Sequence, residues 1–156
     1  MALSVNTQAP DFVLKSKDGD FSDYRLSEQR GSNVVLLFVP GAFTGVCTEE
    51  MCQMTDMLGA MATLNAKVFG ISVDSAFAQE AWKKANDIKF PLLSDFKHEV
   101  VELYDCVLPD LAGLGPASKR VVYLIDKEGV IRYVEETNVP SDQIDFKSLK
   151  SALEAL

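Results

Sequence analysis

The sequence has little histidine, little cysteine and no long apolar segment. It contains one histidine and three cysteines among 156 residues. This composition nearly excludes a zinc finger and leaves little room for catalysis by a Ser-His-Asp triad or a Cys-His pair. The longest aliphatic run covers residues 34–39. A transmembrane helix needs ~20 apolar residues, so we expect no insertion into a membrane.

Positive charge is also scarce. The chain has 15 Lys and Arg residues against 23 Asp and Glu residues, which gives a formal net charge of -8. Binding to nucleic acid or to an anionic membrane surface needs a basic footprint, so both functions are disfavoured. Residues 1–14 lack the basic and apolar stretches of a secretory signal, and an odd number of cysteines suits a reducing compartment. We therefore expect a cytoplasmic protein.

The length predicts a single domain over residues 1–156. The apolar run at residues 34–39, ended by Pro40 and Gly41, is typical of a strand buried on both faces. After Gly45, apolar residues recur at steps of three and four, which predicts a long helix. The residues of this apolar stripe are Met51, Met54, Leu58, Met61 and Leu64.

The next residues predict a strand at 68–73, followed by Asp74 and Ser75 as an N-cap pair for a second helix. The apolar face of that helix has Phe77, Ala81, Trp82 and Ala85. The remaining chain predicts a short strand at 90–93, helical turns at 99–104, a loop at 109–118, a hairpin of strands 121–125 and 130–134, and a helix from Phe146. Parallel strands joined by helices and followed by a hairpin predict an α/β fold. We expect a central mixed β-sheet flanked by helices, the thioredoxin-like arrangement. Periodicity alone would also fit other α/β sandwiches.

The segment from Pro40 to Cys47 joins the first buried strand to the long helix. Sites in open α/β sheets lie at the carboxyl ends of the strands. Cys47 falls near the first turn of the helix, where free N–H groups and the positive end of the helix dipole favour a thiolate. Thr44 would share a face with Cys47 if the turn is already helical, and its hydroxyl could then bond the sulfur or a substrate oxygen. The segment therefore predicts a reactive cysteine.

At these positions the chain resembles the peroxiredoxin family. The family's PxxxTxxC motif is present as Pro40, Thr44 and Cys47, within the run Phe-Val-Pro-Gly-Ala-Phe-Thr that is close to the type-five and one-cysteine groups. The similarity extends from Ala9 to the C-terminal helix. It implies a thiol peroxidase of thioredoxin fold, in which Cys47 attacks hydrogen peroxide or an alkyl hydroperoxide, releases water or an alcohol and becomes a sulfenic acid. It also implies that Pro40 shields the pocket and Thr44 orients the peroxide.

A guanidinium is expected to complete the site. The strand that Arg120 begins should run antiparallel to residues 34–39, so Arg120 should lie beside the end of that strand and next to Cys47. Arg25 and Arg30 precede residues 34–39 and should lie at the other end of the sheet. The family's arginine follows a Ser-x-Arg pattern, which Arg120 matches.

The resemblance also implies two residues that support the catalytic cysteine and arginine without contacting the peroxide. The family often has a glutamate bonded to its arginines, and Glu50 matches its position three residues after Cys47. A second such arginine is matched by Arg132. We expect Glu50 to form an ion pair with an arginine and Glu49 to face the solvent. Two free carboxylates beside Cys47 would otherwise disfavour the negative charge of its thiolate.

Three routes could resolve the sulfenic acid. Cys52 is five residues beyond Cys47, and in an intact α-helix their Cα atoms would lie about 8.6 Å apart. A disulfide tolerates only about 7 Å, so the first helical turn would have to unwind. The bacterioferritin-comigratory branch of the family has this spacing and such unwinding, and the resemblance therefore favours Cys52. Cys106 and an external thiol are the alternatives.

The resemblance further implies a peroxide as substrate and thioredoxin, glutaredoxin or another thiol as reductant, with no cofactor and no metal. Loops near Phe43 and Leu114 often contribute to an end-on dimer in the family, so these residues are candidates for a homodimer surface. Two other functions stay open. A thiol-disulfide oxidoreductase normally has Cys-x-x-Cys, which is absent, and a peroxide sensor or holdase would use the same cysteine.

Overall fold

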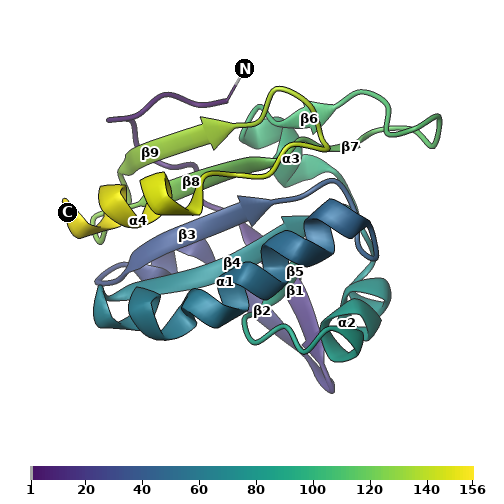
Figure 1. The fold of residues 1–156 in the computed structure, drawn as a ribbon, viewed down its shortest axis with the longest axis horizontal. Helices are drawn as coiled ribbons and strands as arrows, with labels where there is room; N and C mark the ends of the chain where they lie inside the picture. The colour runs from purple at the N-terminus through teal and green to yellow at the C-terminus, as the bar shows by residue number, and fades with distance from the viewer. Residues whose placement is uncertain (1) are drawn as a thin grey trace.

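The computed structural model describes residues 2–156 and contains a seven-stranded sheet with helices on both of its faces (Figure 1). The strands are β1 Val13–Asp18, β2 Asp20–Arg25, β3 Asn33–Phe38, β4 Ala66–Ser72, β5 Leu92–Ser94, β6 Val107–Leu108, β7 Ala117–Ser118, β8 Val121–Ile125 and β9 Ile131–Glu136. The helices are η1 Leu26–Gln29, α1 Gly45–Thr63, α2 Ala76–Ala85, α3 Glu99–Leu103 and α4 Phe146–Glu154. None of these helices is long and apolar enough to cross a membrane.

The sheet has the order β2-β1-β5-β4-β3-β8-β9. Strands β3, β4 and β5 are parallel to one another, as the crossovers through α1 and α2 require, whereas β8 is antiparallel to β3 and to β9. This confirms the predicted α/β fold with a central mixed sheet. The order also brings the end of β3, the end of β4 and the start of β8 together at one edge of the sheet.

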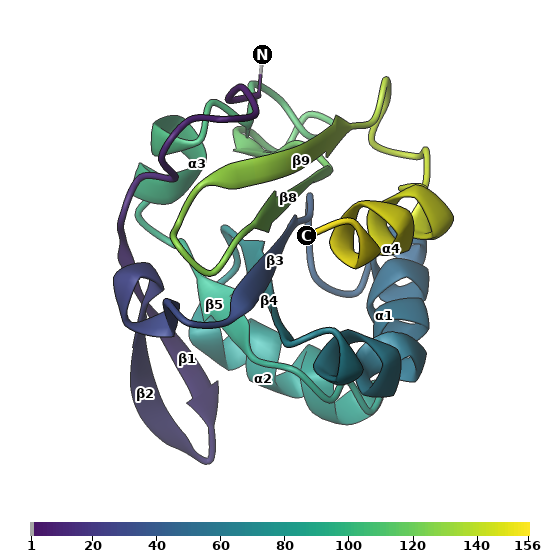
Figure 2. The ribbon, with the colours of Figure 1, turned by 90° about the vertical axis from the view of Figure 1, so that its left-hand side faces the viewer.

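Two apolar clusters pack on the two faces of the sheet. Val35 and Leu37 of β3 point toward α1, α2 and α4, whereas Leu36 and Phe38 point toward α3, η1 and the N-terminal segment. Figure 2 shows the two groups of helices on opposite sides of the strands. All six residues of β3 are buried, because both faces are covered.

The sequence patterns missed two strand pairs. Strands β1 and β2 form a hairpin along the edge of the sheet, where no strand was expected. Strand β2 is almost entirely exposed, so it carries no apolar alternation that could reveal it. The two-residue strands β6 and β7 pair across the predicted loop at 109–118 and are too short to show a period.

The buried face of α2 also differs from the expected one. Trp82 is buried as predicted, but its buried neighbours on α2 are Ala76 and Gln79. Phe77 is 66% exposed and packs its ring edge-on against Phe21 of β2, with 5.8 Å between the ring centroids. The extra hairpin, which the sequence patterns missed, therefore supplies the partner of Phe77.

Two glycines near α1 have different roles. A Cβ on Gly70 of β4 would lie 2.7 Å from Cδ2 of Leu92 and 3.4 Å from Sδ of Met51, so glycine leaves the space in which α1 packs on the sheet. An added Cβ on Gly59 of α1 would meet nothing within 4 Å among the described residues. Gly59 therefore only lowers the helix propensity of its segment.

We predict opposite effects for alanine at these two positions. Gly70→Ala should lower the free energy of unfolding by about 1–3 kcal/mol, because the methyl group overpacks a filled site. Gly59→Ala should raise it by up to about 1 kcal/mol through helix propensity. Urea denaturation followed by circular dichroism measures both. Equal effects of the two changes would contradict the role assigned to Gly70.

Candidate active site

Cys47 lies in the first turn of α1, directly after the loop that leaves β3. The helix begins at Gly45, and the backbone N–H of Thr48 donates to the Thr44 carbonyl at 2.9 Å. The N–H groups before Thr48 have no acceptor inside the helix, so they present positive partial charge at this end. The Cys47 side chain is fully buried. The expected placement of the cysteine at the helix start is therefore what the structure has.

Thr44 is the N-cap of α1 and does not belong to the helix. Its backbone is extended, with a φ of -87°, and its side chain makes no capping bond. The Thr44 hydroxyl instead donates to the Gly41 carbonyl at 2.8 Å. The condition for a shared helical face with Cys47 is therefore not met, and Thr44 is held by the loop that starts at buried Pro40.

This loop has an anchor that the sequence reasoning missed. The N–H of Ala42 donates to Oδ2 of Asp74 at 2.8 Å, and the Ser72 hydroxyl donates to the same oxygen at 2.7 Å. Asp74 follows β4, so the rule that sites gather at the carboxyl ends of strands could have identified it. Asp74 and Ser75 were predicted to cap the next helix. The prediction is correct for Ser75, whose hydroxyl accepts from the N–H of Ala78.

Arg120 lies beside the end of β3 and next to Cys47, as the antiparallel direction of β8 predicted. Phe38 pairs with Val121, so the residue before β8 is next to the end of β3. The guanidinium is 2% exposed, and its Nη2 donates to the Cys47 sulfur at 3.2 Å. Nε and Nη2 also donate to the Pro140 carbonyl, at 3.2 Å and 2.8 Å. Burial alone would lower the pKa of Arg120, but the neighbouring Cys47 and Glu50 outweigh it and raise the pKa.

Glu50 is the second partner of Arg120, as expected, and Glu49 is exposed. Arg120 Nη1 donates to Oε1 of Glu50 at 3.1 Å, and the Glu50 side chain is 1% exposed. Its other oxygen, Oε2, has no hydrogen-bond partner among the described residues. An ion pair normally lowers a carboxyl pKa, yet burial dominates here and raises the pKa of Glu50 to about 7.

The prediction that Arg132 supports the site is wrong. Arg132 Nε donates to Asp126 at 2.7 Å and its Nη1 donates to Asn6 at 2.9 Å. It lies near the start of β9, where Ile131 pairs with Ile125 at the end of β8. Because β8 runs antiparallel to β3, this is the end of the sheet opposite to Cys47.

The other two cysteines occupy different surroundings. Cys52 is half-buried on α1, with its sulfur 3.8 Å from the Asn86 carbonyl. Cys106 is fully buried in the apolar cluster on the α3 side of the sheet, whereas Cys47 belongs to the cluster on the α1 side. Burial raises the pKa of the Cys106 thiol to about 12. Burial therefore disfavours the Cys106 thiolate, and the sheet separates this thiol from Cys47.

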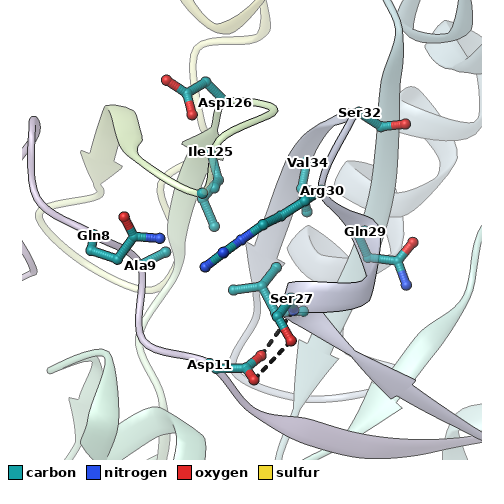
Figure 3. A pocket seen from close by; sticks show the side chains of 12 residues that line it. Gln8, Ala9, Asp11, Ser27, Gln29, Arg30, Ser32, Val34, Ile125 and Asp126 are labelled. Carbon is teal, nitrogen blue, oxygen red and sulfur yellow. Dashed lines mark hydrogen bonds between the residues drawn. The ribbon is translucent and has the colours of Figure 1, made fainter.

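A small hollow lies at the end of the sheet opposite to Cys47 (Figure 3). Arg30 crosses it toward Gln8 and Ala9, and Ser27 bonds Asp11 at its rim. Its cavity volume is about 10 Å³, which holds no more than one water molecule. Arg30 is thus at the far end, as expected, and this hollow offers no space for a peroxide-sized substrate.

Comparison with known proteins agrees with the geometry. The model of the AhpC/TSA family matches residues 5–134. A protein of Synechocystis named as a peroxiredoxin is 36% identical over 145 residues, which cover 88% of this chain and 70% of that protein. Reduced 2-Cys peroxiredoxin of Plasmodium vivax superposes with a TM-score of 0.87 at 28% identity, over 97% of this chain and 80% of that one. Peroxidoxin BcpB of Mycobacterium tuberculosis gives a TM-score of 0.85 at 27% identity, over 97% of each chain.

The chain belongs to the AhpC/TSA family, the peroxiredoxins. Members of this family are thiol-dependent peroxidases with a thioredoxin fold, and this chain is such an enzyme. The predictions of fold, family and reaction class are confirmed.

The raised pKa of Glu50 predicts a pH dependence of stability. Glu50 has an ordinary pKa of 4.5 and a folded-state pKa of about 7, so between these values the folded protein binds more protons than the unfolded chain. Its stabilising contribution is present at low pH and is lost as the pH rises through about 7. Glu50→Gln does not titrate, so its stability relative to wild type should rise over this range, by at most about 3 kcal/mol.

Urea denaturation at about pH 5 and about pH 8 measures this difference. The exposed Glu49→Gln variant is the matched control and should show no comparable change. A Glu50→Gln variant whose stability keeps a constant offset from wild type would contradict the assignment.

Proposed function

We propose that Cys47 is the nucleophile of this peroxidase and that Arg120 activates it. The observation that carries the proposal is the 3.2 Å hydrogen bond from Arg120 Nη2 to the Cys47 sulfur, made by a buried guanidinium. A positive charge this close, in a site shielded from water, favours the thiolate, which is the form that attacks peroxides. The unpaired N–H groups at the start of α1 act in the same direction.

The proposed reaction has one nucleophilic step. The thiolate attacks one oxygen of the hydroperoxide, an S–O bond forms and the O–O bond breaks. The peroxide is reduced to an alcohol, or to water, which leaves with the hydroperoxide proton; the oxidised sulfur takes a proton from water and becomes a sulfenic acid. Arg120 and the first-turn N–H groups stabilise the charge that develops on the oxygens. Pro40 shields the pocket and the Thr44 hydroxyl orients the peroxide.

Cys52 is the proposed resolving residue. It lies on the same helix as Cys47, whereas Cys106 is buried on the other side of the sheet. The Cys52 sulfur attacks the sulfenic sulfur, a disulfide forms, and the hydroxyl leaves with the Cys52 proton as water. Because an intact helix holds the two Cα atoms about 8.6 Å apart, the first turn of α1 must unwind. Thioredoxin, glutaredoxin or another thiol then reduces the disulfide.

We further propose that the chain forms a single domain, that two copies form a homodimer and that the protein is cytoplasmic. Phe43 is 58% exposed and Leu114 is 85% exposed, which supports an apolar contact surface beside the active-site loop. The two loops are neighbours, since a Cβ on Gly41 would lie 3.8 Å from the Leu111 side chain. The odd number of cysteines suits the reducing compartment proposed.

Cys47→Ser should lower the rate constant with hydrogen peroxide by more than about 1,000-fold, because no thiolate remains at the site. Arg120→Met should keep the cysteine but lose about 100-fold, since the guanidinium no longer stabilises the thiolate or the developing oxygen charge. Peroxide consumption with dithiothreitol measures both. Cys106→Ser is the matched control and should stay near wild type. Full activity of Cys47→Ser would show that the nucleophile is misassigned.

One equivalent of hydrogen peroxide should produce an intramolecular Cys47–Cys52 disulfide, because Cys52 is the only other thiol on the same side of the sheet among the described residues. Peptide mapping under non-reducing conditions identifies the bond. Cys52→Ser should lack it and should lose turnover with thioredoxin while still being oxidised once at Cys47. A bond to Cys106, or Cys47 sulfenic acid alone in the wild type, would rule out Cys52.

A further inference from the structure

Three side-chain contacts join α1 to α2 and the residue stretch that follows α2. Trp82 Nε1 donates to the Thr48 hydroxyl at 2.9 Å, the Cys52 thiol lies 3.8 Å from the Asn86 carbonyl, and the N–H of Lys89 donates to the Thr55 hydroxyl at 3.3 Å. Each contact joins residues that are 34 positions apart. We name this set of contacts the polar ladder.

The polar ladder uses one stripe of α1. Residues 48, 52 and 55 are spaced by four and three positions, so they face the same neighbour only while this part of α1 is helical. The first contact lies inside the segment between Cys47 and Cys52, and the third lies beyond it. Unwinding of the first turn of α1 would therefore break the Thr48–Trp82 contact and leave the Thr55–Lys89 contact in place.

Trp82 is the fixed side of the first contact. Its side chain is 1% exposed and packs in the same apolar cluster as Met51 and Met54 of α1. When Thr48 leaves its helical position, the indole N–H loses its acceptor in a buried site. A buried donor without a partner is unfavourable, so this contact opposes opening of the turn.

Cys52 itself belongs to the ladder. Its contact with the Asn86 carbonyl must also break before its sulfur can approach Cys47. A thiol is a weak donor and the distance is long, so the Thr48–Trp82 hydrogen bond is the stronger of these two contacts of the polar ladder.

We propose that the hydrogen bond from Trp82 to Thr48 is a latch that holds the first turn of α1 closed, and that it sets the rate at which Cys52 becomes available. Thr48 and Trp82 are thus positioning residues for the resolving step. The application to that step rests on the proposed function, whereas the latch itself is a property of the reduced protein.

The latch has a chemical consequence. While the turn stays closed, the sulfenic acid of Cys47 can react with a second hydroperoxide. That hydroperoxide would transfer one oxygen to the sulfur, giving a sulfinic acid, and leave as an alcohol. A tighter latch prolongs this interval and a looser latch shortens it. The strength of this hydrogen bond therefore sets which fraction of the Cys47 sulfenic acid becomes the recyclable disulfide and which fraction becomes the sulfinic acid.

The test uses Thr48→Val, which keeps the β-branched shape and a similar helix propensity but removes the acceptor. Thr48→Ser keeps the hydroxyl. Thr55→Val is the matched control, because it deletes the rung of the ladder that lies outside the Cys47–Cys52 segment. The first readout is the rate at which iodoacetamide alkylates Cys52 in the reduced Cys47→Ser protein, followed by mass spectrometry, with Cys106 as an internal reference for global unfolding.

Thr48→Val should raise the Cys52 alkylation rate about fivefold, the usual effect of one hydrogen bond, while Thr48→Ser and Thr55→Val should stay within about twofold of the parent. Alkylation of Cys106 should not change. An unchanged Cys52 rate in Thr48→Val, or a parallel rise at Cys106, overturns the latch.

The second readout is the rate of disulfide formation after one equivalent of hydrogen peroxide, in proteins that keep Cys47 and measured by acid quench and mass spectrometry. Thr48→Val should accelerate the Cys47–Cys52 bond about fivefold without changing the rate of peroxide consumption in the first turnover. If alkylation accelerates but no such bond forms in any variant, the latch stands and Cys52 is not the resolving cysteine. The two proposals therefore fail separately.

Discussion

The buried guanidinium of Arg120 is the group on which the rest of the site depends. It donates to a sulfur on α1, to a carboxylate one turn further along the same helix and to the Pro140 carbonyl of the segment that follows β9. Removing such a cation from water costs several kcal/mol, and only a nearly complete set of acceptors offsets this cost. The sequence meets this requirement by placing Arg120 directly before β8, whose pairing with β3 fixes where the cation lies.

The first turn of α1 is held from two sides, and the proposed reaction would act on one of them. On one side Arg120 attracts Cys47, and on the other side Trp82 binds Thr48. In the proposed reaction, oxidation replaces the Cys47 thiolate by a neutral sulfenic acid, which is a weaker acceptor for a guanidinium. In that reaction the contact of Arg120 with Cys47 weakens, whereas the contacts of Trp82 with Thr48, of Cys52 with Asn86 and of Arg120 with Glu50 remain.

Much of this site could be predicted from the sequence, because local patterns and strand direction were enough. The apolar run before Pro40 and the helical stripe after Gly45 located Cys47 between strand and helix, and the antiparallel hairpin located Arg120. Arg132 failed because its local resemblance says nothing about which end of the sheet it occupies; the pairing of Ile131 with Ile125 decides that. The contacts of Asp74 with Ala42 and of Trp82 with Thr48 join residues 32 and 34 positions apart, which no periodic pattern encodes.

The central sheet also determines how many oxidising equivalents the chain can store. Cys47 and Cys52 are both residues of α1, and Cys106 is enclosed on the opposite side of the sheet among apolar and aromatic residues. A continuous layer of hydrogen-bonded backbone separates it from the reactive sulfur. In a cycle resolved by Cys52, each chain therefore stores two electrons' worth of oxidation as one disulfide, and a thiol titration of the fully oxidised, denatured protein would still count one free cysteine per chain. In that cycle Cys106 is kept apart by the sheet, in addition to the burial that raises its pKa.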